Sequence, residues 1–196
     1  PNVIVTSDDP SAFAALPGFF DIIVADVPCS GEGMFRKDEE AQRQWSEDNV
    51  ALCAARQKRI VADVWPALVT GGFFVYSTCT FNVYENDGNV RWISEELGAE
   101  PLYREDVLET VGGVLKTELG YSLVPGHVEG EGQYCSALRK TSDVEFRQVR
   151  MKPQKPAAAK PAPLPKGLEK LVSVPVRIRQ RGETVIAVPK VIASDL

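Results

Sequence analysis

Two short and almost continuously apolar stretches constrain the fold of this chain most: DIIVADV at 21–27 and FFVYS at 73–77. Runs of this kind are typical of strands that are buried on both faces of a parallel sheet. Between them, the apolar positions from Val50 to Leu68 mostly recur at helical spacing, which predicts a helix that covers the sheet. A strand, a crossover helix and a second strand make a βαβ unit, so the sequence predicts an α/β fold.

The predicted helix carries a start signal and two stop signals. Ser46 is a candidate N-cap, and Glu47 and Asp48 follow in the first turn, where the helix dipole favours acidic side chains. Pro66 is expected to bend or end the helix, and Gly71-Gly72 is predicted to close it.

Further strands and a helix are predicted on either side of this unit. Residues 3–6 form a β-type run, residues 85–97 are predicted to be a helix that ends at Gly98, and 101–139 is rich in strand signals. The segment 134–140 is predicted to be a closing strand.

The composition changes from about residue 141, which divides the chain into three predicted parts. Residues 1–140 form the α/β part, and 141–167 is rich in Pro, Ala and Lys, as in an extended linker. Residues 168–196 alternate apolar and polar positions around Arg-Gly-Glu, which predicts a β-hairpin at the start of a small β-containing domain that remains incomplete.

The composition excludes several classes of protein. No apolar run approaches 18 residues, so no transmembrane helix and no membrane partner are expected. The N-terminus lacks the pattern of a signal peptide. The four cysteines include no CxxC pair and there is one histidine, so no metal site is expected. A cytoplasmic monomer with reduced cysteines is the expectation.

The charge is unevenly distributed along the chain. Residues 1–138 contain 9 Lys and Arg against 22 Asp and Glu, a net charge of −13, whereas residues 139–196 carry 13 against 5, a net charge of +8. The acidic part argues against a general nucleic-acid-binding surface there. The basic part fits contacts with phosphates or a solvated linker equally well.

Two cysteines lie in turns directly after the predicted strands, in DVPCSGEG (26–33) and YSTCT (76–80). Because ligands of open parallel sheets bind outside the carboxyl ends of the strands, Cys29 and Cys79 are predicted to face one pocket. Backbone N–H groups in such turns favour a nucleophilic thiolate. Asp26 supplies a carboxylate nearby for proton transfer.

The alternative for each of these cysteines is an inert buried thiol, which is the interpretation for Cys53 on the apolar helix face and Cys135 in the closing strand. A phosphatase loop is a second alternative, and it needs five residues between the cysteine and an arginine. Six residues separate Cys29 from Arg36, and Glu32 would repel a phosphate, so this alternative fails.

Four segments together carry a resemblance to a known family: DVPCSGEGMFRKD (26–38), WS (45–46), RQ (56–57) and GGFFVYSTCTFNVYEN (71–86). With them, about residues 1–140 resemble the RNA 5-methylcytosine methyltransferases of the Fmu/Sun type, especially the branch called ribosomal RNA small subunit methyltransferase F. The resemblance implies the C-terminal half of a Rossmann-like S-adenosylmethionine-dependent methyltransferase domain. It also implies methylation of carbon 5 of cytosine in RNA, with ribosomal RNA as the expected partner.

The resemblance implies a role for each candidate site residue. Cys79 is the nucleophile that adds to carbon 6 of cytosine, and Cys29 assists release of the methylated RNA. Asp26 contacts the cytosine near ring nitrogen 3 and also lies near the methyl donor. Asp8 or Asp9 contacts the adenosine part of the donor.

The resemblance also bears on RNA binding and on what the chain lacks. Arg36 and Lys37 are candidates for contacts with RNA phosphates, and the alternative is an exposed ion pair with residues 38–40. The Gly-rich donor-binding turn and a catalytic lysine of the family lie upstream of the matching region, so the isolated chain is expected to be inactive. A non-catalytic RNA-binding role that needs an N-terminal half is therefore the alternative function.

Overall fold

The computed structural model describes residues 3–142, 175–181 and 184–189. The described residues fall into two compact units, and each is treated by itself: the larger, Asp9–Glu145, and a smaller one that contains the strands β7 and β8.

The larger unit is built on a six-stranded mixed sheet. Its strands run in the order β1 (Phe20–Asp26), β2 (Leu68–Thr78), β6 (Gln133–Lys140), β5 (Tyr121–Leu123) and β4 (Leu115–Lys116), and β3 (Ala99–Leu102) also pairs with β6. β1 and β2 are parallel, and the other pairs are antiparallel. The predicted pair of parallel strands is confirmed, and so is the closing strand.

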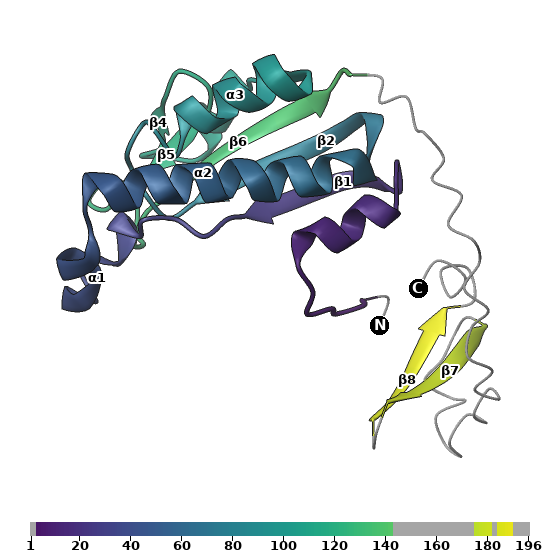
Figure 1. Cartoon of the computed structure of the whole chain (residues 1–196). Helices are drawn as coiled ribbons and strands as arrows, with labels where there is room; N and C mark the ends of the chain where they lie inside the picture. Colours follow the sequence, from purple (N-terminus) through teal and green to yellow (C-terminus); the bar gives the residue numbers. More distant parts are fainter. Residues whose placement is uncertain (1–2, 143–174, 182–183, 190–196) are drawn as a thin grey trace. The chain divides into compact units, whose positions relative to one another are not determined.

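The helices of the larger unit are α1 (Glu39–Gln44), α2 (Glu47–Val64), α3 (Asp87–Leu97) and α4 (Glu105–Thr110), with short 3-10 helices η1 (Pro10–Ala15), η2 (Glu32–Met34) and η3 (Trp65–Ala67). α2 and α3 lie side by side over one face of the sheet (Figure 1). Val61 and Trp65 from the α2 segment and Ile93 from α3 pack there against Phe74 of β2 and Leu138 of β6.

The opposite face of β1 and β2 is exposed, so the expected burial of these strands on both faces is wrong. Side chains alternate between the faces of a strand, so Ile22, Val24 and Phe73 point away from the core. Their exposed fractions are 58%, 68% and 44%, whereas Phe74 is completely buried. Within the described larger unit, the core therefore lies on one side of these two strands.

α2 begins where the sequence predicts and ends earlier. The Ser46 side chain accepts a hydrogen bond from the Asn49 backbone N–H at 3.1 Å, which confirms the N-cap. Pro66 lacks a backbone N–H, so the helix gives way to η3 and the chain enters β2 at Leu68. The prediction that Gly71-Gly72 closes the helix is wrong. Gly71 has a φ of +80°, and it lies inside β2 where the pairing with β1 shifts register.

The predicted strand at residues 3–6 is also wrong. The described residues 3–9 are exposed and hold no strand. A single run of β-type residues has no stability without a partner strand.

In the smaller unit, β7 (Val176–Arg181) and β8 (Thr184–Pro189) pair antiparallel, which confirms the predicted hairpin. Most of the predicted linker, 141–167, lies outside the described residues.

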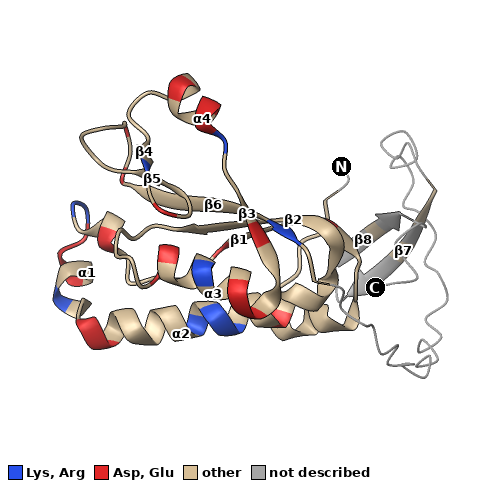
Figure 2. Ribbon diagram, turned by 90° about the horizontal axis from the view of Figure 1, so that it is seen from above, with Lys and Arg blue, Asp and Glu red and all other residues tan. Residues whose placement is uncertain are grey.

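Asp and Glu residues occur in all four α-helices of the larger unit (Figure 2), in keeping with the negative charge of this part of the sequence. None of the helices among the described residues is both long and apolar enough to cross a membrane.

Candidate functional site

The carboxyl ends of β1 and β2 bring the two cysteine turns together. Asp26, the last residue of β1, pairs in register with Ser77 of β2, and its Oδ1 accepts a hydrogen bond from the Ser77 hydroxyl at 2.8 Å. Beyond these residues the sulfur atoms of Cys29 and Cys79 lie 3.0 Å apart, and both side chains are half-buried. The predicted proximity of the two thiols is confirmed, whereas their chemical roles remain predictions.

Glu32 ties the Cys29 turn to the Cys79 turn. Its carboxylate accepts hydrogen bonds from the backbone N–H groups of Phe81 and Asn82, at 2.7 and 3.0 Å. The backbone N–H of Gly33 also donates to the carbonyl oxygen of Cys79 at 2.8 Å. A side chain at residue 33 would collide with that oxygen, since a Cβ would lie 2.8 Å from it.

Glu85 ties the two turns together in the opposite direction. This fully buried carboxylate follows Cys79 in the chain and accepts a hydrogen bond from the backbone N–H of Ser30 at 3.0 Å. It also accepts from the side-chain amide of Asn82 at 2.8 Å. Each cysteine turn thus carries a glutamate that holds a backbone amide of the other turn, and we call this arrangement the glutamate clasp.

Gln57 of α2, which is hydrogen-bonded to Asn89 of α3, supports the glutamate clasp. The side-chain amide of Gln57 donates to Glu85 at 2.6 Å and to the carbonyl oxygen of Pro28 at 2.9 Å. Its oxygen accepts from the Tyr76 hydroxyl at 3.0 Å and from the Asn89 amide at 2.7 Å. Within this buried network the polar atoms of Gln57 and Glu85 have partners, whereas the side-chain oxygen of Asn89 has none. The hydrogen bonds favour one geometry, because each lost partner leaves a costly unpaired group.

Burial sets the electrostatics of the site. It raises the pKa of the Cys29 thiol, with a further contribution from the adjacent Cys79, to about 12. Cys29 therefore keeps its proton at neutral pH. Burial also acts to raise the pKa of Glu32, but hydrogen bonds, led by the one from the Phe81 backbone, outweigh it and hold this pKa below its usual value.

The candidate donor contacts lie apart from the cysteines in the sequence. Asp9 is the N-cap of η1, and its Oδ1 accepts from the backbone N–H and the hydroxyl of Ser11 at 3.1 and 2.7 Å. These bonds hold the pKa of Asp9 below its usual value. Asp8, the other candidate, is exposed.

Arg36 and Lys37 are exposed, and both pair with Glu131. The distances are 2.6 Å from the Arg36 guanidinium and 2.9 Å from the Lys37 ammonium group to the Glu131 carboxylate. An ion pair of these residues was the alternative to RNA contacts, but the expected partners at 38–40 are wrong. The partner lies 95 positions after Arg36, beyond the reach of a local spacing argument.

Three residues of the site gave little signal in the sequence. Glu32 entered the sequence argument as a group that would repel phosphate. Gln57 and Glu85 entered it as members of the segments 56–57 and 71–86 that carry the family resemblance. An amide in an otherwise apolar helical stripe and a glutamate beside each cysteine turn were the available signals. They became informative once the contacts were known.

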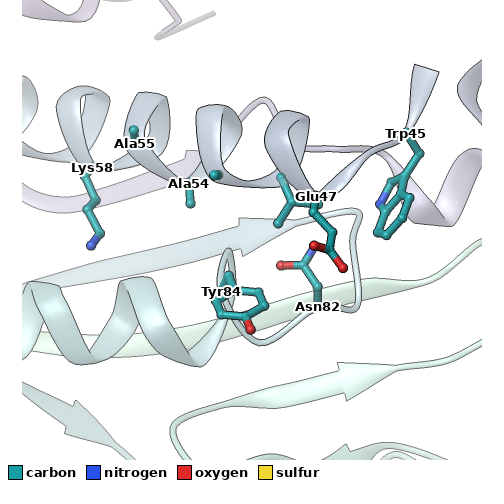
Figure 3. A pocket seen from close by; sticks show the side chains of 9 residues that line it. Trp45, Glu47, Ala54, Ala55, Lys58, Asn82 and Tyr84 are labelled. Carbon is teal, nitrogen blue, oxygen red and sulfur yellow. The ribbon is translucent and has the colours of Figure 1, made fainter.

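A groove of about 550 Å³ lies beside the Cys79 turn (Figure 3). Small and apolar residues of α2 form its floor, while Trp45 and Tyr84 stand at its borders. The Trp45 indole N–H donates to Glu32 at 3.0 Å, which connects the groove to the clasp. Among the described residues, no cluster of three or more His, Cys, Asp or Glu side chains could hold a metal ion.

Comparison with known proteins identifies the family. Residues 1–139 match the family described as 16S rRNA methyltransferase RsmB/F. The chain belongs to this family. Two curated relatives of this RsmB/F chain are named ribosomal RNA small subunit methyltransferase F: one from Cronobacter sakazakii, 40% identical over 147 residues, and one from Escherichia coli, 38% identical over 146. The alignments cover 74% and 73% of this chain but 31% and 30% of the relatives, so the chain spans about a third of their length.

A solved structure shows the same fold. NSun6 from Pyrococcus horikoshii, solved with SFG, superposes with a TM-score of 0.56 at 22% identity, over 70% of this RsmB/F chain and 34% of that protein. The expected Rossmann-like α/β methyltransferase fold is thereby confirmed.

Proposed function

We propose that this chain contributes the cysteine pair of an RNA methyltransferase that uses S-adenosylmethionine to methylate carbon 5 of cytosine in ribosomal RNA. Membership of the RsmB/F family supports the substrate class and the reaction type. The observation that carries the proposal is the 3.0 Å contact between the Cys29 and Cys79 sulfur atoms at the carboxyl ends of two parallel strands.

Cys79 is the nucleophile in this proposal. Its thiolate adds to carbon 6 of the cytosine, which forms a C–S bond and makes carbon 5 electron-rich. After methylation, loss of the carbon-5 proton breaks the C–S bond and returns the electron pair to sulfur. Covalent catalysis of this kind replaces one difficult step by two easier ones.

Cys29 and Asp26 handle protons beside the nucleophile. Because Cys29 keeps its proton at neutral pH, its thiol can donate a hydrogen bond to the Cys79 sulfur when the C–S bond breaks, which assists release of the RNA. Asp26 is exposed at the end of β1, where its carboxyl group would contact ring nitrogen 3 of cytosine and protonate it as the thiolate adds.

The residues present fit a methyl donor at this edge of the sheet. Asp26 presents an exposed carboxyl group beyond the end of a parallel strand, where ligands of such sheets bind, and carboxyl oxygens accept hydrogen bonds from groups such as the hydroxyl and ammonium groups of S-adenosylmethionine. Asp26 would hold the donor here, and the family resemblance also assigns Asp8 or Asp9 to its adenosine part. When bound, it supplies an electrophilic methyl group on a sulfonium.

Arg36 and Lys37 are proposed to contact RNA phosphates. Their side chains are 65% and 60% exposed, so both cationic groups are accessible to a phosphate of a bound RNA. Glu131 competes for the same cations. RNA binding would therefore replace the Glu131 carboxylate by a phosphate as the anionic partner of Arg36 and Lys37.

The full-length protein, incubated with S-adenosylmethionine and RNA that contains 5-fluorocytosine, tests this function. Fluorine at carbon 5 cannot leave as a proton does, so the enzyme should remain joined to the RNA through Cys79. A covalent band on a denaturing gel is expected for the native protein and not for Cys79→Ala. Absence of the band for the native protein, or its persistence in Cys79→Ala, would contradict the proposal.

A further inference from the structure

We propose that Cys29 and Cys79 form a reversible disulfide when a hydroperoxide is present, so that the pair is an oxidation-sensitive modification site. The effect on methyl transfer rests on the function proposed above, whereas formation of the bond does not.

The distance between the two sulfur atoms supports this bond. A disulfide is about 2.05 Å long, so sulfur atoms 3.0 Å apart need to approach by about 1 Å. Cys29 lies outside any helix or strand and Cys79 follows the last residue of β2. A change of side-chain torsion in either turn can supply the approach.

The other two cysteines lack this opportunity. Cys53 is buried in α2, and its sulfur lies 3.9 Å from the side-chain oxygen of Asn49. Cys135 lies in the middle of the sheet, paired in register with Ser77 and Tyr121. Among the described residues, which include all four cysteines, the sulfur–sulfur contact joins Cys29 and Cys79.

The glutamate clasp favours the bond by holding the two turns together before oxidation. Glu32 and Glu85 each fix a backbone amide of the opposite turn, although the cysteines are 50 positions apart in the chain. Most of the conformational freedom that a cross-link would remove is therefore already lost in the folded, reduced chain. The neighbouring thiol is present at a high effective concentration.

Both thiols are half-buried, which leaves a path for a small hydroperoxide. The Cys79 thiolate attacks one peroxide oxygen, the O–O bond breaks, and a sulfenic acid and an alcohol or water form. The Cys29 sulfur then attacks the Cys79 sulfur, the S–O bond breaks, and the oxygen leaves as water. Two electrons pass from the sulfur atoms to the peroxide, and the two thiol protons end on the products.

A disulfide here would stop methyl transfer without unfolding the chain. The Cys79 sulfur would no longer be a free nucleophile, and Cys29 could not assist release. Reduction by a dithiol would restore both groups, because exchange with a thiolate reverses the bond. By sparing the nucleophile from sulfinic acid, the pair would protect the site against irreversible oxidation.

The test oxidises the chain with hydrogen peroxide, blocks the remaining thiols with N-ethylmaleimide and maps tryptic peptides by mass spectrometry without reduction. Residues 1–36 and 60–91 each form one tryptic peptide, so a Cys29–Cys79 disulfide gives a single linked species that dithiothreitol separates. We expect loss of two of the four free thiols and a mass decrease of about 2 Da. Cys135→Ala should retain the linked species, and Cys29→Ser should lose it.

Other outcomes would overturn the inference. Peroxide that converts Cys79 to a sulfinic acid in the native chain, or a cross-link that involves Cys53 or Cys135, contradicts it. Methyl transfer by the full-length protein is measured separately before oxidation. A protein inactive when reduced that still forms the linked peptides refutes the proposed function alone. An active protein that forms no linked peptides refutes the disulfide alone.

Discussion

At the scale of single residues, two chemically identical thiols lie in unequal surroundings. Burial and the neighbouring sulfur raise the pKa of Cys29 to about 12, so Cys29 is the partner that keeps its proton. The raised pKa of Cys29 supports its proposed role in proton transfer, while the roles of both cysteines stay predictions that come from the family resemblance. The surroundings of Cys29 could not be read from the sequence, because both cysteines follow a strand in a similar small-residue turn.

Removing the Cys29 thiol should trap the enzyme on its product. In the full-length Cys29→Ala variant, Cys79 can still attack while release is slowed, so a covalent protein–RNA species should accumulate with ordinary cytosine. A slowly migrating band on a denaturing gel measures it. Cys135→Ala removes a half-buried thiol outside the pair and serves as the control. Normal turnover by Cys29→Ala, without the band, would remove the release role.

Removing the Glu32 carboxylate should cost stability. Glu32→Ala leaves the partly buried Phe81 and Asn82 amides without their acceptor, and a loss of about 1 kcal/mol or more is expected, because an unpaired group that is fully buried costs about 1–3 kcal/mol. Urea unfolding of the chain followed by circular dichroism measures the change. Glu39→Ala, which removes an 87% exposed acid on α1, should change the free energy of unfolding by no more than about 0.5 kcal/mol. Equal effects would argue against the clasp.

At the scale of elements, the short helix η2 sets the spacing between the two turns. Gly33 packs against the chain so closely that a Cβ would lie 2.8 Å from the Cys79 oxygen and 2.9 Å from the Glu131 oxygen. Both are backbone atoms and cannot move aside without shifting their turns. The glycine is required by this close approach.

Gly33→Ala should therefore displace the Cys79 turn. We expect trapping of 5-fluorocytosine RNA by the full-length protein to fall at least about tenfold, since misplacing a reacting group by 1 Å costs as much as a hundredfold. Gly112→Ala is the matched control, because nothing lies within 4 Å of its added Cβ and its φ is not positive. Unchanged trapping by Gly33→Ala would show that the turns adapt to each other.

The ion pairs of Arg36 and Lys37, which follow η2 in the chain, with Glu131 predict a specific titration. Hydrogen bonds from Arg36 and then Lys37 lower the pKa of Glu131 to about 2. The folded pKa lies below the unfolded one, so the stabilisation is present above about pH 4.5 and lost as the pH falls towards 2. Carbon-13 NMR of the Glu131 carboxyl group should follow this titration, and Arg36→Gln with Lys37→Gln should return the midpoint towards 4.5. A midpoint near 4.5 in the unsubstituted chain would refute the pairing.

Helical spacing of apolar residues predicted α2, and continuous apolar runs predicted β1 and β2. The predicted helix end at Gly71-Gly72 was wrong, because a sequence does not distinguish a glycine that ends a helix from one that accommodates an irregular strand. The clasp could not be predicted, because Glu32 and Glu85 find partners about 50 positions away and no local pattern records such contacts.

At the scale of the whole larger unit, the core lies between the sheet and the pair α2 and α3. Phe73 and Phe74 are neighbours in β2 that point to opposite faces, one 44% exposed and one completely buried. Because both residues are phenylalanines, substituting each in turn compares how much the two faces of β2 contribute to stability.

Phe74→Ala should lower the free energy of unfolding by about 3–5 kcal/mol, the usual cost of removing a buried aromatic ring. Phe73→Ala should cost about 1 kcal/mol or less, because much of its ring already contacts solvent. Urea unfolding of the two variants of the chain measures the difference. Equal losses would mean that the second face of these strands is covered when the chain folds.

The order of synthesis adds a consequence of the 50-residue separation between the two thiols. At about 5–20 residues per second, Cys29 leaves the ribosome roughly 3–10 s before Cys79 leaves it. Cys53 appears within that interval as the first thiol that Cys29 could meet wrongly. An α2 that forms early from local contacts would already place Cys53 on the face that the sheet covers once β2 and its neighbours are made.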